Sequence, residues 1–93
     1  MRKALLFITM RVVNRVYIVV VNCSFDPGVD VEVFKKYEDA AEYLQKAWED
    51  YYNAELALGS ILVEDECYHE DDFAQLKWKR GGMAWFHLIE MNI

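Results

Sequence analysis

The strongest constraint on the fold is a single segment with helical periodicity, in a chain whose other patterned segments resemble strands. Between residues 38 and 58 apolar side chains recur every three or four positions, the spacing of one helix face. Glu38 and Asp39 suit the positive end of the helix dipole, and Gly59 suits the residue that ends a helix. Because one helix covers only one face of a sheet, a second face should remain. The apolar positions of this helix are Ala40, Leu44, Ala47, Trp48, Tyr51, Ala54 and Leu58.

Four segments have the pattern of strands. Residues 15 to 22 are β-branched and aromatic with apolar side chains at both parities, as in a central strand. Residues 29 to 36 alternate between apolar and mostly acidic side chains, which indicates a strand buried chiefly on one face. Between them, Asp26-Pro27-Gly28 fits a turn, with proline at the first corner and a glycine of positive φ next. Residues 73 to 79 and 83 to 91 form a hairpin around the glycines that follow Arg80.

These elements predict one α+β domain over residues 1 to 93, in the order β-β-α-β-β. The helix should pack on one face of an antiparallel four-stranded sheet. Residues 60 to 72 are interpreted as a long, solvated loop, since six of the nine residues from 64 to 72 are acidic. A chain of 93 residues is long enough for one hydrophobic core and too short for a second domain.

Residues 1 to 14 leave alternatives open. Arg2 and Lys3 followed by an apolar run imitate a secretory signal, but Arg11 and Asn14 soon interrupt the run and no small-residue cleavage site follows. The same polar residues prevent a membrane span of about 20 apolar residues. The expectation is a cytoplasmic protein. Its first 14 residues form an N-terminal extension, or an extra strand or flap over the sheet from residues 5 to 13.

The face of the sheet away from the helix is expected to be apolar. If the last hairpin has a three-residue loop, Trp85, His87 and Ile89 lie on that face. A two-residue loop would instead leave Phe86 and Leu88 there. A large apolar patch on a free monomer marks a binding site. The N-terminal segment, a second copy of the chain or another macromolecule could cover it.

Charge is distributed very unevenly along the chain. The formal net charge is −6, and residues 38 to 72 hold twelve of the sixteen acids but only one base, Lys46, a local charge of −11. This sign argues against direct binding to nucleic acid or to an anionic membrane. It favours a basic protein partner, and the acids expected to contact that partner are Glu64, Asp65, Glu66, Glu70, Asp71 and Asp72, with Glu42, Glu49 and Asp50 of the helix.

Cofactor and catalytic signals are weak. No nucleophile stands with a base, and no glycine-rich phosphate loop is present, so the chain is expected not to be an enzyme and to need no cofactor. A small zinc-binding protein is a further alternative, since two cysteines and two histidines could supply ligands. Two cysteines without a CxxC spacing indicate a reducing compartment. The four candidate ligands are Cys23, Cys67, His69 and His87.

The stretches VEVFKKYEDAAEYLQKAWEDYYN and AQLKWKRGG, followed by an apolar strand, resemble short uncharacterised phage and mobile-element proteins of Firmicutes. In size and acidity the chain is also similar to anti-CRISPR and other anti-defence inhibitors. That resemblance implies an inhibitor that occupies a basic nucleic-acid-binding surface, as on a nuclease complex. The sequence therefore predicts a non-enzymatic acidic binding protein. The alternative is a protein-interaction or homodimerisation module that acts through the apolar face.

Overall fold

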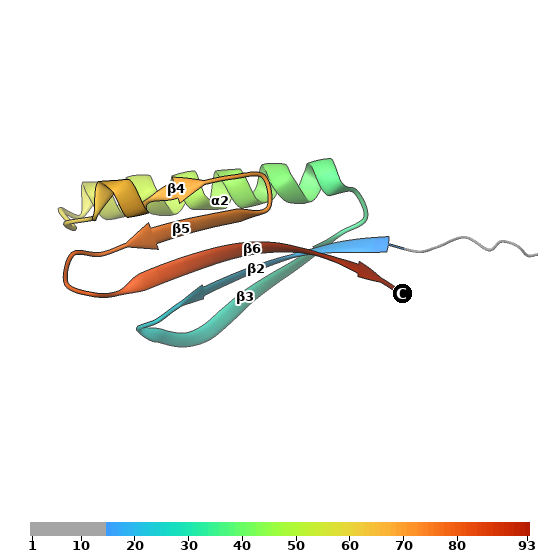
Figure 1. The fold of residues 1–93 in the computed structure, drawn as a ribbon, viewed down its shortest axis with the longest axis horizontal. Coiled ribbons are helices and arrows are strands. Elements are labelled where there is room, and N and C mark those ends of the chain that lie inside the picture. The colour runs from blue at the N-terminus through green and yellow to red at the C-terminus, as the bar shows by residue number, and fades with distance from the viewer. Residues whose placement is uncertain (1–14) are drawn as a thin grey trace, which may run out of the picture.

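The computed structural model describes residues 15–93. In this part of the chain one α-helix packs on one face of an antiparallel five-stranded sheet (Figure 1). The strand order is β3-β2-β6-β5-β4, so β3 and β4 are the two edges. The elements in chain order are β2 (Arg15–Cys23), β3 (Asp26–Phe34), α2 (Tyr37–Ala57), the 3-10 helix η1 (Glu64–Glu66), β4 (Tyr68–His69), β5 (Phe73–Lys77) and β6 (Met83–Asn92).

The α+β class and the antiparallel sheet confirm the expectation, but the number of strands and the element order do not. The segment from 60 to 72 is not a continuous loop: Leu62 is buried and bridges to Trp78, and Tyr68 and His69 form the edge strand β4 against β5. The prediction missed β4 because two residues between acids carry no period of their own. The extra strand suggested for residues 1 to 14 lies outside the described residues. Within residues 15–93 no helix has both the length and the apolarity needed to cross a membrane.

The predicted turn at Asp26-Pro27-Gly28 is wrong by two residues. The chain reverses at Ser24 and Phe25, and Asp26 already pairs with Cys23 at the start of β3. The register then shifts beside Asn22, and the Gly28 amide donates a hydrogen bond of 3.0 Å to the Asp26 carboxylate. This is a local turn inside the strand, which an edge strand tolerates because a proline there breaks no ladder between two neighbours.

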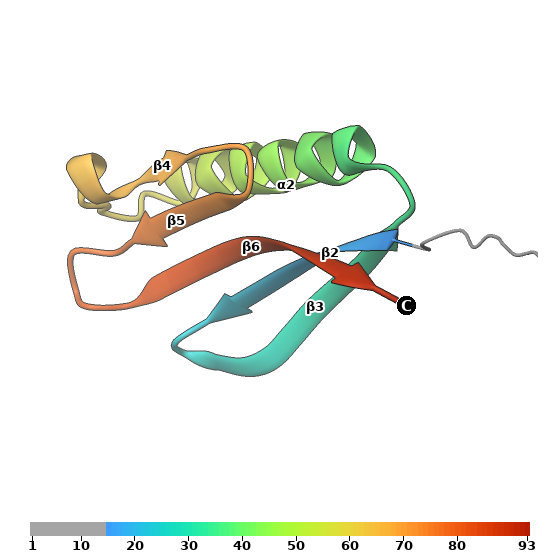
Figure 2. The ribbon, with the colours of Figure 1, turned by 45° about the vertical axis from the view of Figure 1, so that its right-hand side comes forward.

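Helix α2 begins and ends close to the predicted residues and buries one stripe, Ala40, Leu44 and Trp48, against the sheet. The Trp48 indole N–H donates to the backbone oxygen of Gln75 at 2.9 Å, which ties the helix to β5. Figure 2 shows the helix on the β4–β5 side of the sheet, with the beginning of β3, next to the β2–β3 turn, farthest from it. The other buried core residues are Val19, Leu62, Ala74, Leu76, Trp78, Ala84 and Phe86.

The last hairpin has the three-residue loop of the first alternative. The Trp78 amide donates to the Gly82 carbonyl at 2.9 Å, so residues 79 to 81 form the loop, and Gly81 has the positive φ of 113° that the loop needs. Ala74 therefore lies opposite Phe86, and Leu76 lies opposite Ala84. This register sends Phe86 into the core and places Trp85 on the face turned away from the helix.

Candidate protein-binding surfaces

The sheet face turned away from α2, called the open face below, is apolar across several strands. Residues that pair directly across an antiparallel sheet point to the same side, so the register defines its members. Val20 lies between Val31 and His87, and Ile18 lies between Val33 and Ile89. Its apolar and aromatic side chains are Val16, Ile18 and Val20 of β2, Val29, Val31 and Val33 of β3, Trp85, His87, Ile89 and Met91 of β6, Phe73 of β5 and Tyr68 of β4.

Many side chains of the open face are well exposed, and aromatic rings pack against one another at its β4 side. Val33 is 59% exposed and Ile89 is 46% exposed, whereas the core valine Val19 on the other face is 1% exposed. Near β4, the Phe73 ring lies 4.9 Å from the His87 ring and 6.1 Å from the Tyr68 ring. The predicted trio Trp85, His87 and Ile89 does lie on this face, and the valines of β3 enlarge it.

Within the five strands no acid belongs to the open face, since the acids of β3 and β6 have the opposite parity. Glu70, just after β4, lies at its edge, because the Glu70 amide donates to the carbonyl of Phe73 at 2.7 Å and Phe73 belongs to this face. Asp30 pairs with Val21, Glu32 pairs with Val19 and Glu90 pairs with Tyr17, all of which point to the helix side of the sheet. Lys77 of β5 is the formally charged side chain that the register of the five strands assigns to the open face. A protein of net charge −6 therefore has a sheet face to which its strands contribute no acid.

The nine acids predicted to bind a partner are all exposed, but they do not form one row. Glu64, Asp65 and Glu66 make up η1, and the Tyr52 hydroxyl donates to the Glu64 carboxylate at 2.7 Å. That hydrogen bond is the main reason why the pKa of Tyr52 is raised.

The second group of acids, Glu70, Asp71 and Asp72, lies between β4 and β5. Burial and the charges of Asp71 and Asp72 raise the pKa of Tyr37, which puts this group near the start of α2. The two groups bracket the two-residue edge strand β4. Charges beside a short edge strand block pairing with another chain, which gives these acids a role without any partner.

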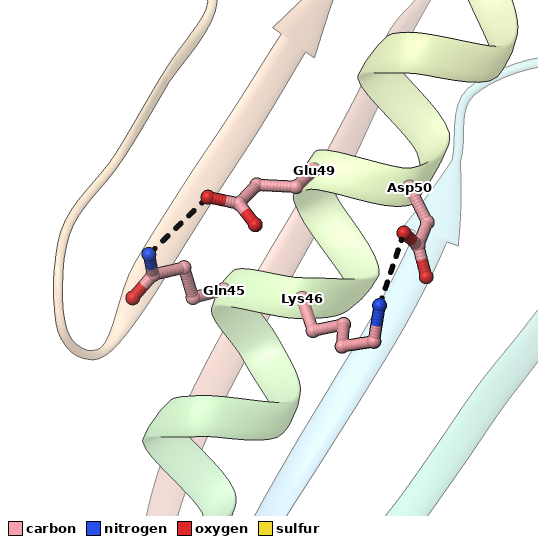
Figure 3. A network of polar contacts seen from close by, with 4 residues as sticks. All are labelled: Gln45, Lys46, Glu49 and Asp50. Atoms are coloured by element: carbon pink, nitrogen blue, oxygen red, sulfur yellow. Dashed lines mark hydrogen bonds and ion pairs between the residues drawn. The ribbon is translucent and has the colours of Figure 1, made fainter.

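The helix acids lie on two different flanks of α2, as Figure 3 shows. Glu49 accepts a hydrogen bond of 3.3 Å from Gln45 on the flank toward β4 and β5. Lys46 and Asp50 form an ion pair of 3.4 Å on the flank toward β2. Both side chains of this pair are more than half exposed, so its contribution to stability is small.

A groove of about 460 Å³ runs along the second flank, between α2 and the end of β3. Phe34, Tyr43 and Ala47 supply apolar surface, and the rings of Phe34 and Tyr43 lie 5.2 Å apart. The charged side chains along it are Asp39, Glu42, Lys46 and Asp50. Sequence reasoning singled out Glu42 and Asp50 but missed the groove, because only the tertiary structure brings Phe34 beside the helix.

The four candidate zinc ligands do not come together. Cys23 lies 3.4 Å from the Tyr51 hydroxyl, Cys67 contacts the backbone of Lys77, and His69 packs 4.9 Å from the Trp48 ring. His87 is on the open face, opposite to the side that carries His69. Among residues 15–93 no three side chains of His, Cys, Asp or Glu gather as metal ligands would, so this part of the chain offers no support for the zinc alternative.

The pKa values of two side chains in this region, Tyr51 and Cys67, are raised. Burial, followed by the hydrogen bond to Cys23, raises the pKa of Tyr51 well above its usual range. Burial also raises the pKa of the Cys67 thiol, and the charges of Glu64, Glu66 and Asp65 add to the effect, against an opposing hydrogen bond from the Lys77 backbone. A thiol that is protonated at neutral pH is a poor nucleophile.

Comparison with protein-family models, curated proteins and solved structures gave no match to this chain. Two surfaces of the molecule remain as candidate binding sites. The open face is apolar and receives no acid from the strands, and the α2–β3 groove combines apolar side chains with a largely acidic rim.

Proposed function

We propose that this chain is a non-enzymatic protein-binding module that pairs with a second copy of itself through the open face. The observation that carries the proposal is an apolar sheet face, to which the strands contribute no acid, on an otherwise acidic molecule. Two copies of charge −6 repel each other through most orientations. When open face meets open face, the strand acids Asp30, Glu32 and Glu90 of both copies point away from the contact.

The size of the open face is appropriate for a small dimer interface. Its five most exposed side chains, at 46 to 59% exposure, present on the order of 400 Å² of apolar surface, as much as the largest patch on a typical monomer. Its half-buried members raise this to roughly 600 Å² per copy, near the ~800 Å² of a standard specific interface. The five side chains are Val29, Val31, Val33, Ile89 and Met91.

A second copy fits this face for a geometric reason as well. Two twisted sheets pack face to face at about 10 Å, with their strands about 30° apart, and such a sandwich buries both apolar sides at once. A two-fold dimer uses the same patch on each subunit, so a face of uniform apolar character is self-complementary. The Val31 side chains of both copies would then lie in the interface.

Sedimentation equilibrium of the full chain tests the proposal. We expect a dimer with a dissociation constant below about 100 μM that changes less than about threefold between roughly 50 mM and 500 mM NaCl, since the strands contribute no acid to the interface. Val31→Asp should weaken the dimer at least about 100-fold, because each copy would bury a carboxylate beside apolar side chains. Val31 is 54% exposed in the single copy, so this variant should still fold.

Ile61→Asp is the matched control, since Ile61 is 67% exposed and lies outside the five strands. It adds the same charge and should leave the dimer unchanged. A wild-type chain that stays monomeric at about 1 mM would overturn the proposal and leave residues 1 to 14 or an unrelated protein as the occupant. Equal effects of the two variants would overturn it as well.

The acidic surface supports a second candidate function, an inhibitor that covers a basic nucleic-acid-binding surface of another protein. The observation that favours it is that all nine acids are exposed and that all of them lie outside the five strands, so the dimer would leave most of them in solvent. Capture of a nucleic-acid-processing partner should fall steeply as salt is raised. Replacing the acids of residues 64–72 by Asn and Gln should abolish capture, and unchanged affinity would count against this function.

A further inference from the structure

The α2–β3 groove, we propose, binds a basic amphipathic segment of another protein. This inference refines the second candidate function, since it moves the contact from the acids around β4 to a shaped site. The groove has a volume of about 460 Å³, which suits a few side chains of a peptide and is far too small for a folded domain.

The chemistry of the groove selects its ligand. Its floor of Phe34, Tyr43 and Ala47 favours aliphatic contact, and three carboxylates against one ammonium give its rim a formal charge of −2. Lys and Arg combine an apolar stem with a charged head, so their stems can pack on the floor while their heads reach the rim. The two aromatic rings add a cation–π attraction.

Beyond the groove, the helix-facing side of β3 carries further acids. Asp30 and Glu32 lie on the same side of β3 as Phe34, as their partners Val21 and Val19 on β2 show. Both side chains are exposed. A bound segment that runs along β3 would therefore meet acids beyond the groove as well, which requires cations at more than one position.

The spacing of the helix residues favours a segment that lies along the helix. One stripe along α2 is formed by residues that are three or four positions from a member in the next turn: Asp39, Glu42, Tyr43, Lys46, Ala47 and Asp50. A partner helix with apolar and basic residues on one side matches such a stripe, in the manner of an amphipathic helix in a groove. Lys46 should weaken the binding of a basic segment, because its ammonium group lies 3.4 Å from the Asp50 carboxylate and neutralises that charge.

The test is fluorescence anisotropy with a labelled peptide of about a dozen residues, made of Leu and Lys so that both lie on one helical face. A peptide with Glu in place of Lys is the control ligand. The full-length protein should bind the basic peptide at least about tenfold more tightly than the acidic one. Raising NaCl from about 50 mM to about 500 mM should weaken binding roughly tenfold.

Matched variants separate the groove from general acidity. Asp39→Asn combined with Glu42→Gln should weaken the basic peptide at least about fivefold, whereas Lys46→Gln should strengthen it about two- to threefold. Glu49→Gln removes a helix acid from the opposite flank and should change affinity less than about 1.5-fold. If Glu49→Gln weakened binding as much as the groove variants do, the acids would act only as a diffuse field and the proposal would be wrong.

Two further variants separate this inference from the proposals above. Val31→Asp, which breaks the proposed dimer, should leave peptide binding unchanged. The proposals for the groove and for the open face can therefore be rejected independently. If the protein bound the basic peptide but captured no nucleic-acid-processing partner, the inhibitor function would be rejected and the groove would remain a peptide-binding site. The competing occupant is this chain's own residues 1 to 14. If replacing Arg2, Lys3 and Arg11 by Gln raised peptide affinity tenfold or more, that segment would fill the groove and a separate partner would be excluded.

Discussion

Replacement of Glu55 should show how the C-terminal end of α2 is held on the sheet. Its carboxylate oxygen Oε1 accepts hydrogen bonds from the Trp78 indole N–H at 2.8 Å and from the Ser60 hydroxyl at 2.7 Å. Trp78 is only 2% exposed in the intact chain, and Glu55 is the acceptor of its indole N–H. Ser60 is half-buried and can turn toward solvent. The cost of Glu55→Ala should therefore come mainly from the orphaned indole.

The magnitude follows from these two contacts. A hydrogen bond to a charged group contributes about 1.5–3 kcal/mol, and a buried donor left without an acceptor costs about 1–3 kcal/mol. Against this, removing a negative charge near the negative end of the helix dipole returns about 0.3–1 kcal/mol. The net loss for Glu55→Ala is about 2–3 kcal/mol. Glu55→Gln keeps an oxygen acceptor and receives the same electrostatic benefit, so its loss should stay below about 1 kcal/mol.

Urea denaturation followed by far-UV circular dichroism measures both variants without relying on tryptophan fluorescence. With an m value near 1–1.5 kcal/mol per M, the midpoint of Glu55→Ala should fall by about 1.3–3 M. The titrations are run at several protein concentrations, because self-association would add to the apparent stability. In a Trp78→Phe background, Glu55→Ala should cost at least about 1 kcal/mol less. Equal losses for the Ala and Gln variants, or no coupling to Trp78, would refute the reasoning.

Three other predictions follow from buried groups. Leu44→Ala empties a site that is 0% exposed and should cost about 2–5 kcal/mol in urea denaturation, whereas Leu56→Ala, at 45% exposure, should cost less than about 1 kcal/mol. The fold raises the pKa of Tyr51, which means that it favours the protonated phenol. The stability advantage of the wild type over Tyr51→Phe should therefore be fully present below about pH 10 and shrink as the pH rises above it; an advantage that grew with pH would contradict this sign. Cys67, whose thiol pKa is raised, should be alkylated by iodoacetamide at pH ~8 at least about fivefold more slowly in the folded chain than in urea, as peptide mass spectrometry can measure.

The two proposed surfaces are compatible with each other. The open face belongs to the side of the sheet away from α2, and the groove lies between α2 and β3. A dimer formed through the open faces would keep both grooves outward, so that one dimer could hold two basic segments. Such bivalency increases the avidity for a partner with repeated basic segments.

The local sequence pattern was sufficient to predict the elements whose apolar residues follow a regular pattern. The helix from Tyr37 to Ala57 could be predicted because its buried stripe recurs every three or four residues, and β2 could be predicted because its run is β-branched. The apolar second face also followed from the sequence, since one helix cannot cover both sides of a sheet. By contrast, the turn after β2 was misplaced, because proline and glycine signal a turn equally well when they sit in a strand irregularity.

What only the tertiary structure decided is which distant residues share a surface. Periodicity along one strand leaves its register against the next strand open, and a slip of one residue exchanges the two faces. The loop of residues 79 to 81 settles this for Trp85 and Phe86. In the same way, β4 exists because β5 offers it an edge, and the groove exists because β3 ends beside α2. The sequence by itself determined an acidic α+β chain with an apolar face to spare, and the packing of distant strands decided how that face and the acids are arranged.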